Sequence, residues 1–464
     1  MDYDVIIIGS GPAGLAAATL IAGKGGKVLL LDEQLRPGGQ IYRNVENTSM
    51  NLRKILGSDY ACGEALVKKM RQQSVDYIPG AVVWQVTEGR EVGYSVNGKS
   101  SLVRAPWVII ATGATERPFP IPGWTLPGVM MAGAAQTLLK SSGLAADGAV
   151  FAGCGPLLYL VASQYLRAGV KIAALLDTGA KPNYLAALPY FSGALKRWDM
   201  LAKGMKWISD IRRSETRVIK RVSELRIEGK EEATGVSYRT YSGAAGQIET
   251  KNIFLHHGVV PNVNLAMAAN VEHLWSDEQI CWYPRVDSWG CTNVDGLLIA
   301  GDGAGISGGL AAEAAGRLAA LWCLKELGKI DPTECDSLAR AQISALKHET
   351  RIRPFLDNWF KPPEPFRVPD GDTIVCRCEE LTAKDISDVI DIGVAGPNQL
   401  KSFSRAGMGP CQGRYCGLTV QELIAKKTGR KMSDIGYYRL RPPIKPISLG
   451  EFAEMDAGPP ANES

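Results

Sequence analysis

Short uninterrupted apolar runs, separated by glycine-rich turns, are the main pattern along this chain. Residues 5–8, 28–31 and 297–300 are each four consecutive apolar residues. Runs of this length without polar alternation are typical of strands that are buried on both faces of a parallel sheet. An alanine-rich stretch of helical length separates the first two runs. The pattern therefore predicts βαβ units and an α/β fold class.

A glycine loop in the stretch GSGPAG follows the first run and predicts a dinucleotide site. Such a loop makes a tight turn, lets the backbone approach a pyrophosphate and lets the next helix pack closely on its strand. The helix N-terminus adds N–H groups and a partial positive charge. Asp32 lies 18 residues after Gly14, at the spacing of a ribose-binding acid, and Glu33 is its alternative. The predicted loop residues are Gly9, Gly11, Pro12, Ala13 and Gly14.

Composition narrows the function classes. The chain has 464 residues, 45% hydrophobic and 22% charged, with a net charge of +4. No block of five like charges marks a nucleic-acid surface, so no nucleic-acid partner is expected. The longest apolar run, at 150–162, is shorter than the roughly 20 residues of a membrane span. We therefore expect a cytoplasmic protein without a transmembrane segment. Association with the inner membrane face through an electron acceptor is an additional possibility.

Three further stretches carry a family resemblance: RPGGQIYR at 36–43, WVIIATGATERPFPIPG at 107–123, and the Gly301–Asp302 pair before a glycine- and alanine-rich helix. With the first glycine loop, they resemble the two-dinucleotide-domain flavoproteins of the disulfide-reductase type. The resemblance implies that Asp302 binds a flavin ribityl chain, and the alternative is that this acid only caps its helix. It also implies that Thr112 and Gly113 lie beside the cofactor. Gly39, Gln40 and Arg43 are candidate contacts to flavin or to a partner, with a structural strand edge as the alternative.

A second glycine motif at 148–178 departs from the binding pattern. Gly153 and Gly155 are present, but Leu158 stands where the third glycine is expected, and Asp177 is one residue late for a ribose acid. We therefore favour a domain that no longer binds nucleotide over an NAD(P)H site. The histidine pair at 256–257 is interpreted as a structural turn rather than a catalytic base, and no catalytic residue is assigned.

Four cysteines near the end of the chain predict a metal centre. Cys376 and Cys378 form one pair and Cys411 and Cys416 another, with 32 residues between the pairs. Thiolates suit zinc or an iron–sulfur cluster, and four unliganded thiols are the third alternative. The segment resembles the [2Fe–2S] domain of bacterioferritin-associated ferredoxin. This resemblance favours a [2Fe–2S] cluster, which would give a flavin a one-electron exit. The other six cysteines are interpreted as reduced structural thiols.

These signals predict a two-dinucleotide-domain flavoprotein with a small, mainly helical C-terminal [2Fe–2S] domain. The tail around YYRLRPPIKPISLGEF is expected to be an extended arm, because its prolines disfavour a helix. The expected segments are an FAD or nucleotide-binding domain at 1–118 and 285–330, an inserted NAD(P)-like domain without nicotinamide at 119–284, a linker at 331–370, the cluster domain at 371–430, and a partner-binding tail at 431–464.

Over its full length the chain resembles the A-type, or α-type, subunits of heteromeric amine and imino-acid dehydrogenases. This group includes opine oxidases, hydroxyproline and proline dehydrogenases, and hydrogen cyanide synthase. The resemblance rests on LLLDEQLRPGGQIYR, GCGPLL, GDGAGISGG and GMGPCQGRYC. It implies membership of a hetero-oligomeric oxidoreductase that acts on CH–NH or CH–NH2 bonds, with this subunit inactive alone. The implied role is to relay electrons from a glycine-oxidase-like flavoprotein subunit.

Cofactor, partner and function alternatives stay open at this point. The first site is expected to hold FAD or another adenine nucleotide such as ATP, and an FMN at a subunit interface is a further candidate. A small ferredoxin-like subunit is a second candidate partner. Two other functions fit the motifs: a self-sufficient NAD(P)H-dependent flavin and iron–sulfur reductase, and a scaffold that holds a nucleotide structurally.

Overall fold

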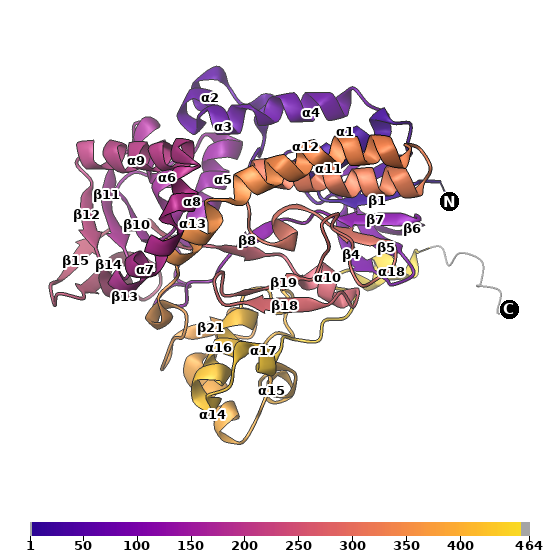
Figure 1. Ribbon diagram of the computed structural model, residues 1–464. Helices are drawn as coiled ribbons and strands as arrows, with labels where there is room; N and C mark the ends of the chain where they lie inside the picture. The colour runs from indigo at the N-terminus through magenta and orange to yellow at the C-terminus, as the bar shows by residue number, and fades with distance from the viewer. Residues whose placement is uncertain (1, 456–464) are drawn as a thin grey trace.

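Five parallel strands form the first sheet of the molecule. The computed structural model describes residues 2–455, and the sheet lies beneath helices α11 (Gly309–Glu326) and α12 (Pro332–Thr350) in Figure 1. The strand order is β20-β7-β1-β2-β3. Two strands differ by one residue from the apolar runs that predicted them: β2 extends to Asp32, one residue beyond its run, and β20 ends at Ile299, one residue before the end of its run. The strands are β1 (Val5–Ile8), β2 (Val28–Asp32), β3 (Val75–Pro79), β7 (Trp107–Ile110) and β20 (Leu297–Ile299).

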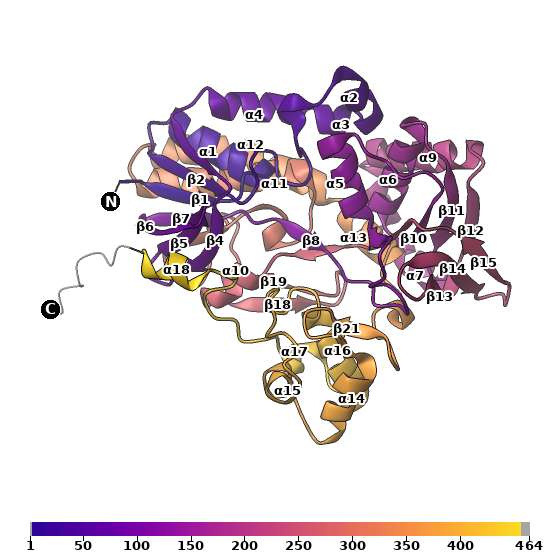
Figure 2. The ribbon, with the colours of Figure 1, turned by 180° about the vertical axis from the view of Figure 1, so that it is seen from behind.

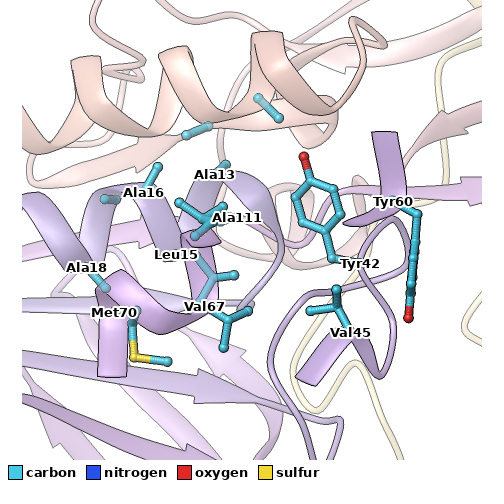
Figure 3. Packing of buried hydrophobic residues seen from close by; sticks show 14 of the residues in the cluster. Ala13, Leu15, Ala16, Ala18, Tyr42, Val45, Tyr60, Val67, Met70 and Ala111 are labelled. Carbon is cyan, nitrogen blue, oxygen red and sulfur yellow. The ribbon is translucent and has the colours of Figure 1, made fainter. Parts of the chain in front are cut away.

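Both faces of this sheet are covered, which explains its unbroken apolar strands. Val5 and Ile7 pack with helices α1 (Pro12–Gly23) and α11, whereas Ile6 and Ile8 pack against a small antiparallel sheet. Figure 3 shows the helical side, with Ala13 and Ala16 of α1 directed at α11. The other elements around this sheet are β4 (Val82–Val86), β5 (Glu91–Val96), β6 (Lys99–Arg104), η1 (Val45–Asn47), α2 (Met50–Leu56), α3 (Ser58–Ala61), α4 (Gly63–Arg71) and η3 (Gly301–Ala304).

The segment expected to be a linker, 331–370, is largely helical. Asp331 caps α12 by accepting hydrogen bonds from the N–H groups of Thr333 and Glu334. Cys335 and Ala339 of this helix are buried in the core of the first sheet. Helix α13 (Arg353–Trp359) and the turn η4 (Glu364–Phe366) follow. The first domain therefore includes a helix that the sequence placed outside it.

A second parallel sheet carries the second glycine motif. Its strand order is β12-β11-β10-β16-β9, and an antiparallel sheet of three strands covers one face. The parallel strands are β9 (Val129–Met131), β10 (Ala149–Cys154), β11 (Ile172–Asp177), β12 (Arg217–Lys220) and β16 (Ile253–His257). The covering strands are β13 (Val222–Gly229), β14 (Ala233–Thr240) and β15 (Ala245–Glu249). The helices are α5 (Ala132–Ser142), α6 (Pro156–Arg167), α7 (Lys181–Ala187), η2 (Leu188–Tyr190), α8 (Phe191–Leu195) and α9 (Trp198–Arg213).

Two short antiparallel strands mark the crossing between the domains. β8 (Ala114–Glu116) leaves the first domain and pairs with β17 (Val259–Pro261), which returns to it. After this return, α10 (Asn264–Ala268) contributes Leu265 and Ala266 to the core of the first sheet. A hairpin of β18 (His273–Ser276) and β19 (Cys281–Pro284) follows. The chain thus re-enters the first domain near residue 258, earlier than the expected boundary at 284.

The C-terminal domain is small and mainly helical. It lies below both sheets in Figure 1 and in the reverse view of Figure 2. Trp124 and Trp282 donate indole N–H bonds to the Ile374 carbonyl and the Gln421 side chain, each at 2.8 Å, and so join it to the other domains. Its elements are β21 (Ile374–Cys376), β22 (Leu381–Thr382), α14 (Ala383–Asp391), α15 (Pro397–Ser404), α16 (Gly417–Thr428) and α17 (Met432–Ile435). Among residues 2–455, no helix is long and apolar enough to cross a membrane.

The arm that follows runs back to the first domain of the same chain. The Ile444 N–H donates to the Trp84 carbonyl at 2.9 Å, and the Ile444 side chain is buried in the core of the first sheet. A short helix, α18 (Leu449–Ala453), begins three residues after Pro446, with Ser448 and Glu451 in a capping box. The extended part of the expected tail therefore ends at Ser448. Residues 456–464 of that tail lie outside the described residues.

Candidate functional site

The first glycine loop has no room for side chains. A Cβ on Gly9 would come within 2.4 Å of the Ala111 carbonyl oxygen, and one on Gly14 within 1.8 Å of the Gly9 carbonyl oxygen. A Cβ on Gly39 would lie 2.7 Å from the Cα of Gly11. Helix α1 starts directly after Gly11 without a side-chain cap, so its first N–H groups are available to an anion. Gly39, from a separate loop, thus lies against the loop that was predicted to hold a pyrophosphate.

The two acids at the end of β2 have different surroundings. Asp32 is buried, and its carboxylate accepts hydrogen bonds from Ser10 N (2.5 Å), Ser10 Oγ (2.6 Å) and Gln34 N (2.7 Å). Glu33 is about half exposed and forms an ion pair with Lys445 of the C-terminal arm. Burial works to raise the pKa of Glu33, but Lys445 and the charge of Arg414 lower it overall. Asp32 therefore ties the glycine loop to the strand, and Glu33 is the carboxylate nearer the surface.

Gln40 and Arg43 belong to a hydrogen-bond network beside this strand end. Arg43 donates to Gln40 Oε1 at 2.9 Å, and the buried Lys140 donates to the Gln40 carbonyl and to Gln136 Oε1, both at 2.9 Å. Burial, with the nearby charge of Arg43, lowers the pKa of Lys140 to about 7. A cavity of about 270 Å³ opens next to the network. It is lined by Gln34, Leu35, Arg36, Arg43, Asn44 and Ser141.

The segments predicted to face a flavin also meet at this edge of the sheet. A Cβ on Gly303 would lie 3.5 Å from the backbone of Gly113, so the loops after β20 and β7 touch. Asp302 Oδ1 accepts from the N–H groups of Ser307 (2.8 Å) and Gly308 (2.9 Å), just before α11. These N–H groups belong to the loop before α11 and to its N-cap residue, Gly308, and the helix has no side-chain cap. The other oxygen, Oδ2, accepts no hydrogen bond from residues 2–455, so the same side chain could also bind a ligand hydroxyl.

The four cysteines lie together as two pairs. A hydrogen bond with Cys416, followed by contributions from backbone N–H groups, lowers the pKa of the Cys376 thiol to about 6. The same bond, with burial, raises the pKa of Cys416. Burial and contact with Cys411 raise the pKa of Cys378. Within the described chain, no three or more His, Cys, Asp or Glu side chains are grouped closely enough to hold a single metal ion.

Glycines shape the loop around these thiols. A Cβ on Gly409 would come within 2.3 Å of the Cys378 side chain, and Cβ atoms on Gly407 and Gly413 would meet the ring of Tyr438 at 2.5 and 2.7 Å. Tyr438 is itself buried. The Gly407 N–H points to the Cys376 sulfur. The loop can therefore press against the thiols and present backbone N–H groups to them.

The cysteine loop is in contact with the edge that carries the first site. Asn264 donates to the Gln412 carbonyl, next to Cys411, at 2.9 Å. Two residues earlier, the Asn262 N–H donates to the Gly113 carbonyl at 3.0 Å. A small cavity of about 20 Å³ between the two regions is lined by Asn262, Asn264 and Arg414, among others. Asn262–Asn264 is therefore a short bridge between the thiols and Gly113.

In the second glycine motif, the space above the glycines is filled by protein. The ring of His256 lies over Gly155, where a Cβ would come within 2.9 Å of it. His256 Nδ1 pairs with Glu116 Oε1 at 2.7 Å, and the imidazole is almost fully buried. Asp177, the acid at the end of β11, accepts from the Tyr159 hydroxyl and the Gly179 N–H, both at 2.7 Å. The polar groups of a nucleotide site are thus already paired within the chain.

Residues 359–366, which we call the covering segment, lie across the same edge. The Trp359 ring lies 4.4 Å from that of Tyr184, and Cys154 Sγ contacts the Phe360 carbonyl at 3.5 Å. Asn183 donates to the Lys361 carbonyl at 2.6 Å. At the far end, Phe366 packs edge-on against Phe119, which stacks on the buried ring of His257. Both histidines of the 256–257 pair therefore make packing contacts in the interior.

Two family matches together cover most of the chain. Residues 3–317 match the pyridine nucleotide-disulphide oxidoreductases, and residues 370–456 match the sarcosine oxidase A3 domain. The opine oxidase A-subunit of Agrobacterium tumefaciens (strain Ach5) is 43% identical over 98% of this chain and 92% of that protein. The chain belongs to the family of opine oxidase A-subunits. The A-type family predicted from the sequence is thereby confirmed.

Other relatives of this opine oxidase A-subunit family member have different names. A hydrogen cyanide synthase subunit of Pseudomonas aeruginosa is 30% identical over 98% of this chain and 99% of that protein. Among solved structures, an L-proline dehydrogenase from P. horikoshii aligns with a TM-score of 0.71 at 21% identity, covering 97% of this chain and 79% of that one. The structural likeness confirms the predicted fold class, two disulfide-reductase-like dinucleotide domains with a helical C-terminal domain.

Several contacts of the candidate site were not predicted from the sequence of this family member. Arg414, Lys445 and Asn264 lie far along the chain from the glycine loop and carry no motif of their own. The signal for Arg414 was its place between Cys411 and Cys416, in GPCQGRYC. Lys445 stands between prolines in the arm and gave no such signal. By contrast, all the predicted loop residues of the first site do meet at one edge of the sheet.

Proposed function

We propose that this chain is the electron-transfer subunit of a heteromeric dehydrogenase that oxidises an amine, imino acid or opine. A partner, a glycine-oxidase-like flavoprotein subunit, would oxidise the substrate. Electrons would pass to a flavin held by or against the first site and then to a [2Fe–2S] cluster at Cys376, Cys378, Cys411 and Cys416. A small ferredoxin-like subunit, and an FMN between subunits, are compatible with the same scheme.

The single observation that carries this proposal is the contact between the cysteine loop and the first site. Asn264 holds the Gln412 carbonyl, and Asn262 holds the Gly113 carbonyl. Gly113 follows the β7 strand, where the family resemblance puts the flavin. A redox centre built on the four thiols would therefore be a close neighbour of a flavin in the first site. An electron relay needs its cofactors close together. The cofactors carry the electrons, and the protein's part is to position and tune them.

The pairing of the thiols supports a two-iron cluster over zinc. A structural zinc site gathers four ligands around one ion. A [2Fe–2S] cluster instead takes four cysteines for two irons, so two thiols serve each metal. The shortest contacts are Cys376 with Cys416 and Cys378 with Cys411, and the charges of Cys376 and Cys411 also reach Cys378 and Cys416. Among residues 2–455, no three or more of these side chains converge on one ion position. When bound, the cluster would accept and donate single electrons.

The residues of the first site fit an adenine dinucleotide. The start of α1 offers free N–H groups, and the close approach of Gly39 to Gly11 leaves a side-chain-free surface for a pyrophosphate. Asp302 retains one unused carboxylate oxygen for a ribityl hydroxyl. The cavity beside Glu33 offers Arg36, Arg43 and amide groups to the adenosine end. The residues therefore suit FAD, and the same adenylate features would also suit ATP.

The second domain supports a partner, rather than NAD(P)H, as the electron source. His256 covers Gly155, Asp177 is paired with Tyr159, and residues 359–366 lie over both. Nicotinamide dinucleotide would have to displace these contacts. No feature of the described chain favours the self-sufficient reductase. The names of the relatives, subunits of opine oxidase and of hydrogen cyanide synthase, support an amine-type substrate oxidised by a multi-subunit enzyme.

Reconstitution with the partner tests the proposal. The full-length chain, the glycine-oxidase-like partner and their mixture are each assayed for dye reduction with opines, imino acids and amines. Only the partner-containing samples should oxidise substrate, and the flavin bound by this chain should bleach anaerobically only in the mixture. NADH added to the isolated chain should leave that flavin oxidised. Rapid bleaching by NADH, or substrate turnover by the chain alone, would overturn the relay role.

A further inference from the structure

An apolar surface on α7, η2, α8 and the start of α9 is unusual for a folded chain. Seven of the twenty-two exposed large hydrophobic residues lie within positions 185–205. Their exposed fractions range from 44% to 71%. We call these residues the α7–α9 patch: Leu185, Leu188, Tyr190, Phe191, Leu195, Trp198 and Met205.

The inner side of the same segment is already packed. Ala187 and Ala194 are buried against Ile352 and Phe355 at the start of α13. Phe191 lies at the border of this layer of short helices, because its ring also packs on Phe355 with 5.9 Å between the ring centroids. The other six exposed residues make up the outer apolar side. In Figures 1 and 2 this layer lies at the end of the molecule opposite the N-terminus. Because the inner side is already packed, the outer side chains cannot be buried within this layer.

The size of the patch matches one side of a stable interface. Large side chains bury about 180 Å² each when fully covered, so the seven together offer roughly 700 Å². The largest patch on a typical monomer is about 300–600 Å², whereas a standard protein interface buries about 800 Å² per partner. The area therefore points to a protein-sized occupant.

The charge around the patch argues against pairing with a second copy. Residues 181–213 contain seven lysines and arginines but only two aspartates, a net charge of +5. Arg197 is buried and paired with Asp199 and Glu349, and Lys203 pairs with Asp59. The other five cations have no carboxylate partner among residues 2–455: Lys181, Lys196, Lys206, Arg212 and Arg213. Two copies joined patch to patch would bring these cationic rims together, and like charges across an interface cost free energy. An acidic rim on a different protein would be complementary. Aromatic anchors such as Trp198 and Tyr190 are typical of such interfaces.

From these observations we infer that the α7–α9 patch is the docking surface for the flavoprotein subunit of the proposed enzyme. The inference rests on the proposed function, which supplies the partner. The patch lies on elements of the second domain, α7, η2, α8 and α9, which carry neither the first site nor the cysteine loop. The partner that docks here presents an apolar area with acidic side chains around it. The second domain thus contributes a binding surface although its nucleotide edge is filled.

The test compares substitutions at three exposed positions of the full-length chain, two in the patch and one outside it. Trp198→Glu lies in the patch, and Leu102→Glu on β6 is the control at the opposite end of the molecule. Affinity for the purified glycine-oxidase-like partner is measured by titration calorimetry. Trp198→Glu should raise the Kd at least about 30-fold, as for an interface hot spot, and Leu102→Glu should change it less than about twofold. Leu195→Glu, at a second patch position that is 53% exposed, should behave like Trp198→Glu.

The outcomes separate the two proposals. If the unmodified chain forms no complex with the partner, the proposed function fails and the docking surface with it. If the complex forms and Trp198→Glu and Leu195→Glu bind as tightly as the unmodified chain, only the docking surface fails. Loss of a self-associated dimer, or of binding to vesicles with half anionic lipid, without loss of partner affinity would assign the patch to a second copy or to a membrane and overturn the inference. Circular dichroism and melting temperature confirm that each variant is folded.

Discussion

Cys411 stands where the thiol pairs and the first site meet, and its replacement tests the metal centre. The chain purified without oxygen should contain about two irons and two acid-labile sulfides. Cys411→Ser removes one thiolate, so the EPR signal of the reduced protein should vanish or shift strongly. The matched control is Cys62→Ser, an exposed cysteine of the first domain, which should retain full iron and sulfide. Stoichiometric zinc without sulfide in the unmodified chain would contradict the assignment.

The protonation of Lys140 should change the free energy of unfolding of the chain. Its pKa in the folded chain is lowered to about 7 from 10.5. Between these values the unfolded chain holds a proton that the folded chain has lost, so the free energy of unfolding rises with pH in this window. Below pH 7 both states are protonated, and the cost of the buried charge is fully present.

The comparison is with Lys140→Met, which has a similar shape and no charge. From pH 7 to pH 10, the unmodified chain should gain up to roughly 4 kcal/mol of stability relative to this variant. Chemical denaturation at each pH measures the difference. Lys99→Met, at an exposed position on β6, should show a difference that does not change with pH. A flat difference for Lys140→Met as well would mean that the lysine is not buried as a charge.

The arm after Arg439 is the element whose removal should be most informative. It buries Ile444 in the core of the first sheet and brings Lys445 to Glu33. Covering a side chain such as isoleucine contributes about 1.5–3 kcal/mol. A chain that ends at Arg439 should therefore unfold at lower denaturant concentration by about this free energy, and its C-terminal domain should be cleaved faster by protease. Affinity for the flavoprotein partner, measured alongside, tests the partner-binding role predicted from the sequence.

A chain that ends at Met455 is the control for this truncation, because it keeps all the contacts just named. It should be more stable and more resistant to protease than the chain that ends at Arg439. If the chain ending at Arg439 matched it, the arm would not fasten the C-terminal domain to the first domain.

Elements with strong local patterns were predictable from the sequence, whereas those stabilised by distant contacts were not. β1 was predicted to the residue because four apolar positions are followed at once by the glycine loop. Helix α12 was missed because only a narrow stripe, with Cys335 and Ala339, is buried against α11. Helix α18 was missed although Ser448 and Glu451 have the spacing of a capping box, since the prolines before it dominated the interpretation.

At the scale of the whole molecule, the sequence predicted the components of the site but not how they meet. Glycine loops and cysteine spacings are local, so the first site and the thiols could be found by their spacing. The bridge from Gln412 to Asn264 joins residues 148 positions apart, and the pair of Lys445 with Glu33 joins residues 412 apart. Such contacts depend on how the domains pack, which no local pattern specifies. The binding roles of the predicted site residues remain predictions.

The covering segment affects how the protein responds to free nicotinamide dinucleotides. Because residues 359–366 are tethered to the domain that they cover, their local concentration is set by the chain, in the range of roughly millimolar or above, and does not fall as the protein is diluted. A free dinucleotide competes against this fixed internal occupant. Under the proposed function, the reduction state of the protein should then follow the supply of electrons from its partner and not the ratio of NADH to NAD⁺.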